Sequence, residues 1–190
     1  MLKSSKTVMN CPDHVTRFKR WYVRPYNRLK KIKNGDGQFV ALSIGLFLCE
    51  RYYRTKTKTQ NDPHAPSNRA FMKEAASDLK VDQELFNKFW LIYRHGMQHQ
   101  GMPKKVKEKK NGMEIWNRWL VDPYIGGPFF ERPTSYIDSQ GQVIICLNIW
   151  KFTDLMIKKF LDNPAMIADA FTHALAEIYS DSRKKLLPKP

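Results

Sequence analysis

The sequence contains few cysteines and no long run of apolar residues. Its three cysteines, Cys11, Cys49 and Cys146, lie far apart, and none belongs to a C-x-x-C pair. This spacing fits neither a disulfide framework nor a structural zinc site, so we expect a cytoplasmic location, where thiols stay reduced. No run reaches the roughly 18 apolar residues of a membrane-spanning helix, and residues 1–10 lack the apolar segment of a secretion signal. We therefore expect neither export nor membrane insertion.

Acidic residues are scarce relative to basic ones. Lysine and arginine number 33 of the 190 residues against 18 aspartates and glutamates, which gives a formal net charge of +15. Such an excess attracts polyanions over long distances, so nucleic acid or an anionic membrane surface is the leading class of partner. Hydrophobic residues make up 42% of the chain and aromatic residues 13%. This composition supports a packed core and excludes a wholly disordered chain.

Helical periodicity dominates the sequence. We predict a single, mainly α-helical domain over residues 1–182, followed by a disordered basic tail over residues 183–190. The first expected helix runs to about residue 33 and is bent or restarted at Pro25, because proline crowds the preceding turn. The other expected helices cover about residues 36–52, 67–79, 82–99, 150–161 and 163–178.

β structure is expected in one place only. Residues 134–149 contain two runs rich in β-branched and aromatic residues, separated by Ser-Gln-Gly-Gln, which is typical of a short hairpin. The lysine-rich run 104–110 is expected to be a loop or a frayed edge. The predicted fold class is thus a mainly α-helical bundle with a small β-hairpin near the C-terminal part.

The helix expected at residues 82–99 carries the most informative pattern. At about 100° per residue its apolar side chains share one arc, which we expect to face the core. Arg94 lies at the flank of this arc, while His95 and His99, spaced four residues apart, lie on the opposite side. The arc consists of Phe86, Phe89, Trp90, Tyr93 and Met97.

Arginine and histidine together suit the cleavage of a phosphodiester. Imidazole titrates near neutral pH and transfers protons, whereas guanidinium supplies a fixed charge and planar donors for a phosphate whose negative charge grows in the transition state. In RNA the nucleophile is available in the substrate as the 2′-hydroxyl. The protein then has to supply only proton transfer, charge stabilisation and in-line positioning, and no metal is required.

Arg94, four intervening residues and His99 match the R-x4-6-H motif, in which the residue after arginine is typically Asn, Asp or His, here His95. On these residues the chain resembles the HEPN superfamily, over the helical region up to about Pro103. HEPN domains are α-helical bundles, and many are metal-independent endoribonucleases of toxin, anti-phage and CRISPR-associated systems. In these enzymes two motifs meet across a dimer interface in one composite cleft and usually produce a 2′,3′-cyclic phosphate.

The resemblance implies a function and a role for each residue of the motif. It implies an endoribonuclease that acts on RNA as a homodimer without metal or other cofactor, with an antitoxin or other regulatory protein as a possible further partner. Arg94 would bind and stabilise the scissile phosphate, His99 would transfer protons, and His95 would orient or support them. Five lysines directly after the motif are candidate nucleic-acid-binding residues, or else solubilise a loop: Lys104, Lys105, Lys107, Lys109 and Lys110.

Other interpretations of these residues stay open. Arg94, His95 and His99 are also compatible with a solvated helix C-terminus, where the helix dipole favours cations. The two histidines have the spacing of a metal-binding pair, but the glutamate of H-E-x-x-H and a nearby third ligand are absent. The whole chain is also compatible with a non-catalytic nucleic-acid-binding or toxin–antitoxin regulatory module, or with a protein-interaction scaffold.

The first expected helix mixes cations with aromatic residues such as Phe18, Trp21 and Tyr26. This mixture fits a nucleic-acid surface, with the rings stacking on bases. The rings recur at helical spacing, however, so we expect most of them in the core and the cations in solvent.

Overall fold

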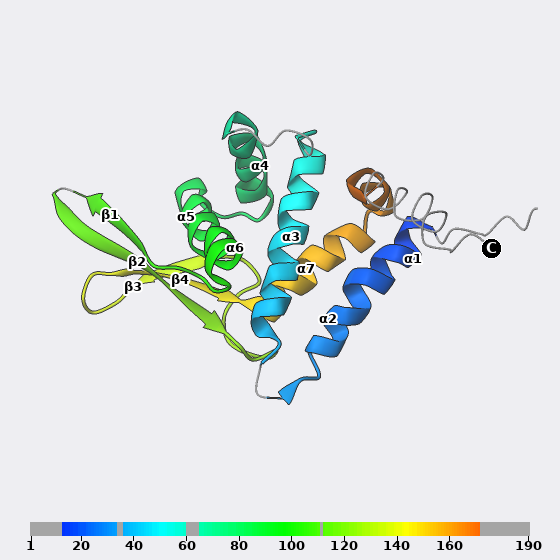
Figure 1. Cartoon of the computed structure of the whole chain (residues 1–190). Coiled ribbons are helices and arrows are strands. Elements are labelled where there is room, and N and C mark those ends of the chain that lie inside the picture. The colour runs from blue at the N-terminus through cyan, green and yellow to red at the C-terminus, as the bar shows by residue number, and fades with distance from the viewer. Residues whose placement is uncertain (1–12, 34–35, 60–64, 111, 172–190) are drawn as a thin grey trace, which may run out of the picture.

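The computed structural model of the chain describes residues 13–33, 36–59, 65–110 and 112–171. Helices predominate in these residues, and one small sheet of four strands lies at one end of the helical layer (Figure 1). The prediction of a mainly α-helical protein is therefore confirmed. The expected basic tail, residues 183–190, lies outside the described residues. None of the described helices is both long and apolar enough to cross a bilayer.

The first helix is continuous but irregular. It consists of α1 (His14–Phe18), a π-helical segment (Lys19–Val23) and α2 (Arg24–Leu29). The N–H of Arg24 donates to the carbonyl of Lys19, five residues back. This widened turn lies directly before Pro25, whose ring crowds the turn that precedes it, so the irregularity expected there takes the form of a π turn.

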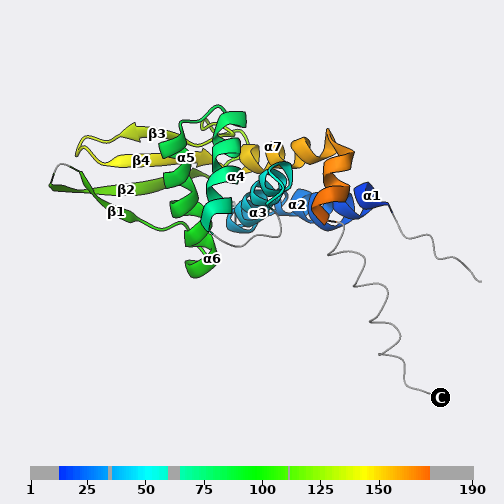
Figure 2. The same ribbon diagram turned by 90° about the horizontal axis from the view of Figure 1, so that it is seen from above.

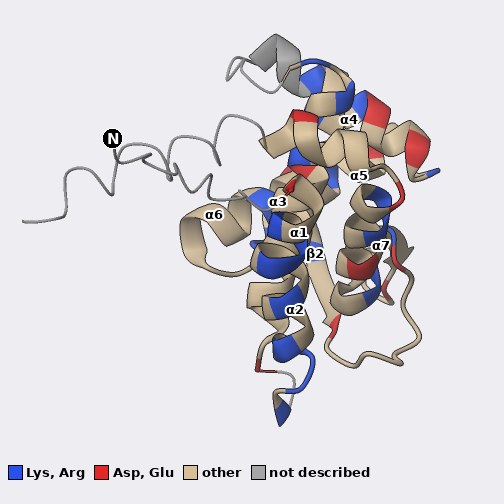
Figure 3. Ribbon diagram, turned by 90° about the vertical axis from the view of Figure 1, so that its right-hand side faces the viewer, with Lys and Arg blue, Asp and Glu red and all other residues tan. Residues whose placement is uncertain are grey.

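The cations and the aromatic rings of this first helix are segregated. Phe18 and Tyr26 are buried, and Trp21 packs against the same core. Lysines and arginines follow the outer side of α1 and α2 (Figure 3). The expectation that its aromatic residues belong to the core is confirmed for these three.

The central pair of helices is α3 (Gln38–Lys56) and α7 (Ile149–Leu161), which cross in close contact (Figure 1). A Cβ atom at Gly45 would lie 2.5 Å from Oγ1 of Thr153, so only glycine permits this approach. The Thr153 hydroxyl donates to the carbonyl of Ala41 at 3.0 Å. Beyond α3, the chain continues through α4 (Ala65–Asp78) and α5 (Gln83–Phe89).

The sheet consists of β1 (Val106–Lys110), β2 (Met113–Asp122), β3 (Thr134–Ile137) and β4 (Val143–Asn148) in the order β1-β2-β4-β3. β2 and β4 are parallel, and the two outer pairs are antiparallel.

The sheet is larger than the sequence predicted. The segment expected as a hairpin at residues 134–149 supplies β3 and β4, but these strands belong to the mixed sheet rather than to a separate hairpin. Residues 104–110 were expected to be a loop or a frayed edge, and the loop is wrong for residues 106–110, which form the edge strand β1. β2 was not predicted at all.

Helices cover one face of this sheet (Figure 2). The hydroxyl of Tyr93 donates to the carbonyls of Leu120 on β2 and Ile145 on β4, at 3.0 and 2.9 Å. Lys88 of α5 forms an ion pair of 3.2 Å with Glu108 of β1. No described helix covers the opposite face, which we call the open face.

Candidate functional site

The helix that carries Arg94, His95 and His99 begins where the sequence predicted. Asp82 caps α5, because its Oδ1 accepts a hydrogen bond of 3.0 Å from the N–H of Leu85. Four residues of the predicted apolar arc are buried, and Met97 packs against the same core. The buried four are Phe86, Phe89, Trp90 and Tyr93.

The candidate residues lie where this helix changes its geometry. After α5, a π-helical segment (Trp90–His95) leads into α6 (Gly96–Gln100), and the helix ends at Gly101 with a left-handed φ of 71°. A π turn contains more residues than an α turn, so side chains beyond it are displaced from positions expected at 100° per residue. Such turns occur frequently at functional sites.

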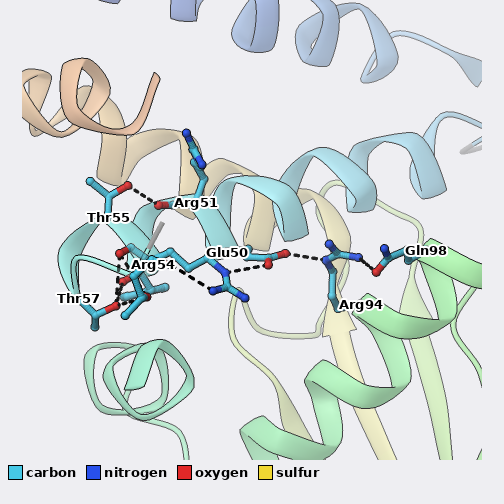
Figure 4. A network of polar contacts seen from close by, with 9 residues as sticks. Glu50, Arg51, Arg54, Thr55, Thr57, Arg94 and Gln98 are labelled. Carbon is cyan, nitrogen blue, oxygen red and sulfur yellow. Dashed lines mark hydrogen bonds and ion pairs between the residues drawn. The ribbon is translucent and has the colours of Figure 1, made fainter. Parts of the chain in front are cut away.

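Arg94 is held by partners on two helices (Figure 4). Its Nε donates to Oε2 of Glu50 on α3 at 2.8 Å, and its Nη1 donates to Oε1 of Gln98 at 2.5 Å. Its side chain is 26% exposed. Its other Nη group has no hydrogen-bond partner among the described residues, so one edge of the guanidinium is free to bind an anion.

Glu50 was missed by the sequence analysis, although it holds two arginines. Its second carboxylate oxygen accepts a hydrogen bond of 2.9 Å from Nε of Arg54, one helical turn further along α3. The available signal was a single acidic residue in the largely apolar stretch 39–53, placed four residues before an arginine. Its pairing with Arg94, 44 residues away, could not be inferred from that local pattern.

His95 and His99 are both exposed and lie on neighbouring turns, with their ring centroids 6.1 Å apart. Partial burial lowers the pKa of His95 below its usual value, and the charges of Lys104, Arg94 and His99 lower it further. A histidine with a lowered pKa is mostly neutral at pH 7, and a neutral imidazole is able to accept a proton.

The chain beyond α6 turns back across this helix at Gly96. A Cβ atom there would lie 2.6 Å from the backbone N of Lys104 and 2.8 Å from Cα of Pro103. The N–H of Lys104 donates to the carbonyl of Ile92 at 3.0 Å. This close return explains why the charge of Lys104 acts on His95.

The candidate lysines do not gather at one place. Lys104 lies next to the helix, whereas Lys105, directly before β1, and Lys107 and Lys109 within it are exposed and alternate with Val106 and Glu108, which are turned toward the helices. Successive side chains of a strand point to opposite faces, so these three lysines belong to the open face. The last candidate, Lys110, ends β1.

A shallow hollow of about 220 Å³ lies beside Arg94, between α3 and α6. Neither His95 nor His99 lines it, so within one chain the guanidinium faces α3 while the imidazoles face solvent. The residues that line it are Ser43, Leu46, Phe47, Arg94, Met97 and Gln98.

No group of three or more His, Cys, Asp or Glu side chains in the described part of the chain is arranged to hold a metal ion. His95 and His99 therefore have no third protein ligand among these residues. Comparisons of the chain with protein-family models, with curated proteins and with solved structures find no match in any of the three.

Proposed function

We propose that this protein is a metal-independent endoribonuclease with a HEPN-like helical region, and that the 2′-hydroxyl of the RNA is the nucleophile. One observation carries the proposal. A guanidinium held in place by Glu50 and Gln98 lies on the same helical segment as two exposed imidazoles on neighbouring turns. These groups match what RNA cleavage needs, a fixed cation for the phosphate and groups that transfer protons near neutral pH.

The surroundings of Arg94, His99 and His95 favour a different role for each residue. Arg94 binds the scissile phosphate through the guanidinium edge that Glu50 and Gln98 leave unpaired. His99, exposed at the end of α6, accepts the proton of the 2′-hydroxyl as that oxygen attacks the phosphorus. The bond from phosphorus to the 5′-oxygen breaks and the 5′-oxygen takes a proton from solvent, which leaves a 2′,3′-cyclic phosphate and a 5′-hydroxyl. His95 stays neutral next to Lys104 and orients the reacting groups.

A second copy of the chain would complete the site. The α3 surface next to the Arg94 hollow carries two exposed apolar residues, Val40 at 54% and Phe47 at 44%. Two copies related by a twofold axis at this surface would cover these side chains and bring two sets of Arg94, His95 and His99 together. A composite cleft of this kind would compensate for the separation of guanidinium and imidazoles within one protomer.

The test is cleavage of a labelled single-stranded RNA in the presence of chelator. We expect Arg94→Ala and His99→Ala to lower the rate by at least about 100-fold each, because each removes charge stabilisation or proton transfer. Arg28→Ala, an exposed arginine of α2, is the matched control and should cleave at the wild-type rate. A deoxynucleotide at the cleaved position should abolish turnover. Equal rates for all four proteins would refute the proposed site.

Mixing the two inactive variants tests the composite site. If Arg94 of one protomer and His99 of the other act on the same phosphate, a 1:1 mixture of Arg94→Ala and His99→Ala regains about a quarter of wild-type activity, because half of the dimers contain one intact site of two. No recovery in a mixture that exchanges subunits would contradict the composite arrangement.

A non-catalytic nucleic-acid-binding or toxin–antitoxin regulatory module is the second candidate. The net charge of +15 and the ion pair that already neutralises Arg94 favour it. Binding that weakens with salt is expected of both candidates, so cleavage separates them. Two free, buried cysteines, Cys49 and Cys146, support a cytoplasmic location for either function.

A further inference from the structure

The open face of the sheet carries side chains that the core does not use. Along β2, Trp116, Arg118 and Leu120 are exposed, while Asn117 and Trp119 between them point toward the helices. Trp116 is 42% exposed and Leu120 40% exposed. Large side chains of this kind are normally buried, so their position outside the core needs an explanation.

The register brings rings and cations next to one another on this face. Lys107 of β1 lies opposite Trp116 of β2, with its Nζ 5.5 Å from the centroid of the indole ring. Ile144 of β4 lies between Arg118 of β2 and Tyr136 of β3. Neighbouring strands are about 4.8 Å apart, so Arg118 and Tyr136 are separated by about 10 Å across the sheet.

A hollow of about 290 Å³ opens at the same place. Its volume lies near the lower end of small-molecule pockets, about 300 Å³, which suits one nucleotide of a longer strand. It combines an aromatic wall, two cations and two amides: Trp116, Lys105, Arg118, Gln140 and Gln142.

Cations outnumber acids on this face, and the acids present are already paired. Glu114 forms an ion pair with Lys107, and Asp138 lies 3.7 Å from Arg118. The lysine and arginine in these pairs are each 44% exposed. Exposed pairs contribute little, so a phosphate group can replace either carboxylate. Lys105 and Lys109 add two further positive charges.

We propose that the open face binds a single-stranded nucleic acid. Bases stack on Trp116 and Tyr136, while phosphates contact Lys107 and Arg118. Sequence-tolerant recognition of single strands combines basic tracks with aromatic platforms in this way. A protein partner fits less well, because lysine is depleted from the cores of protein interfaces and here it flanks the exposed rings. The proposal goes beyond the proposed cleavage activity and holds whether or not Arg94 and His99 cleave RNA.

Binding of a fluorescent 12-nucleotide 2′-O-methyl RNA, measured by anisotropy, tests this proposal. This probe lacks the 2′-hydroxyl nucleophile, so cleavage plays no part in the result. We expect Trp116→Ala and Tyr136→Ala each to weaken binding about tenfold through the loss of one stacked base. Tyr124→Ala removes an aromatic side chain that is 73% exposed and lies outside the open face, and it should bind like the wild type.

Two further measurements separate stacking from simple charge attraction. Trp116 is the most exposed tryptophan of the chain, so binding should quench tryptophan fluorescence, and Trp116→Phe should remove the quenching while it retains most of the affinity. Lys107→Gln should reduce the slope of log K against log salt by about 0.7, whereas Lys31→Gln, in the turn that follows α2, should not.

Three outcomes would overturn the proposal. The first is that Trp116→Ala and Tyr136→Ala bind the oligonucleotide as tightly as the wild type. The second is that Tyr124→Ala weakens binding as much as they do. The third is that a duplex binds as tightly as the single strand. A shift from dimer to monomer in Trp116→Ala, seen by sedimentation with unchanged oligonucleotide affinity, would instead identify this face as a contact between two copies. DNA of the same sequence shows whether the backbone sugar matters, and equal binding of the two probes supports recognition through stacking and phosphates.

Discussion

The two faces of β2 place the same residue type in opposite surroundings. Trp119 points toward the helices and meets the ring of Phe39 edge to face, with centroids 6.4 Å apart. Trp116, three residues earlier, points away from the helices, is 42% exposed and is accompanied by Lys107. Packing accounts for Trp119 but not for Trp116.

This difference separates structural side chains from candidate functional ones. The covered face joins the core that α5 fills with aromatic rings, so a change there should reduce the free energy of unfolding. The open face contributes little to that free energy, so a change there should alter binding and leave folding nearly intact. Measurements of stability and of binding on the same variants therefore test the distinction directly.

The largest effect is expected from Phe89→Ala in α5, which lies on the covered face of the sheet. Phe89 is fully buried and its ring lies 5.0 Å from that of Tyr93 and 5.7 Å from that of Phe152. Removing it leaves a cavity, which should lower the free energy of unfolding by about 3–5 kcal/mol in urea denaturation. Trp116→Ala should change it by less than about 0.5 kcal/mol. Similar losses in both variants would show that the two faces do not differ in this way.

A smaller loss of stability is expected from Gly96→Ala, at the point of the helix that residues 102–104 contact on the way to the sheet. The new methyl group would lie 2.6 Å from the backbone atoms of Lys104 and Met102, neither of which can move like a flexible side chain. We expect a loss of about 2 kcal/mol. Gly126→Ala is the control, since nothing lies within 4 Å of its Cβ position. An unchanged free energy of unfolding in Gly96→Ala would contradict the close contact between Gly96 and residues 102–104.

The helix that begins with α5 could be predicted from the sequence because its signals are local. Asp82 caps it, and the apolar spacing from Phe86 to Tyr93 gives its buried side. These patterns need only neighbouring residues, and the structure confirms them. The π turn before Gly96 leaves no such pattern and was not predicted.

The strands and the partner of Arg94 depend on residues far apart in the chain. The segment Val106–Lys110 is a strand because β2 pairs with it, while its lysines alone indicate a loop. The ion pair between Glu50 and Arg94 links two helices. Motif and composition therefore pointed to Arg94, His95 and His99, but neither Glu50 nor the open face could be inferred without the fold.

Two buried asparagines allow a finer test of the covered face. Asn117 of β2 is 1% exposed, and neither its Nδ2 nor its Oδ1 has a hydrogen-bond partner among the described residues. An unpaired buried amide is unfavourable, so Asn117→Val should raise the free energy of unfolding by about 1 kcal/mol.

Asn148 is the matched control for that variant. It caps α7 by accepting from the N–H of Lys151 at 2.9 Å, and its Nδ2 donates to the carbonyl of Tyr124 at 2.9 Å. Asn148→Ala should lower the free energy of unfolding by about 1 kcal/mol. Thermal or urea unfolding curves measure both changes. If Asn117→Val were destabilised like Asn148→Ala, the Asn117 amide would have hydrogen-bond partners.

The smallest effect concerns Lys104 and Lys105, two neighbouring lysines directly before β1 of which one lies next to the helix and the other on the open face. The pKa of His95 is lowered by partial burial and then by the charge of Lys104, so Lys104→Gln should raise it toward its usual value near 6.5. Lys105→Gln, on the open face, should leave it unchanged. NMR titration of the His95 ring protons measures both shifts.

The same shift predicts how stability depends on pH. Because the folded pKa of His95 lies below its unfolded value, the folded state binds fewer protons between the two values. The resulting destabilisation is absent above about pH 6.5, grows as the pH falls from there to the lowered pKa, and is complete below it. Lys104→Gln should therefore weaken this acid dependence, whereas Lys105→Gln should retain it. If both variants changed the acid dependence of stability equally, Lys104 and Lys105 would not differ in their distance from His95, and the open face would not be separate from the helix that carries His95.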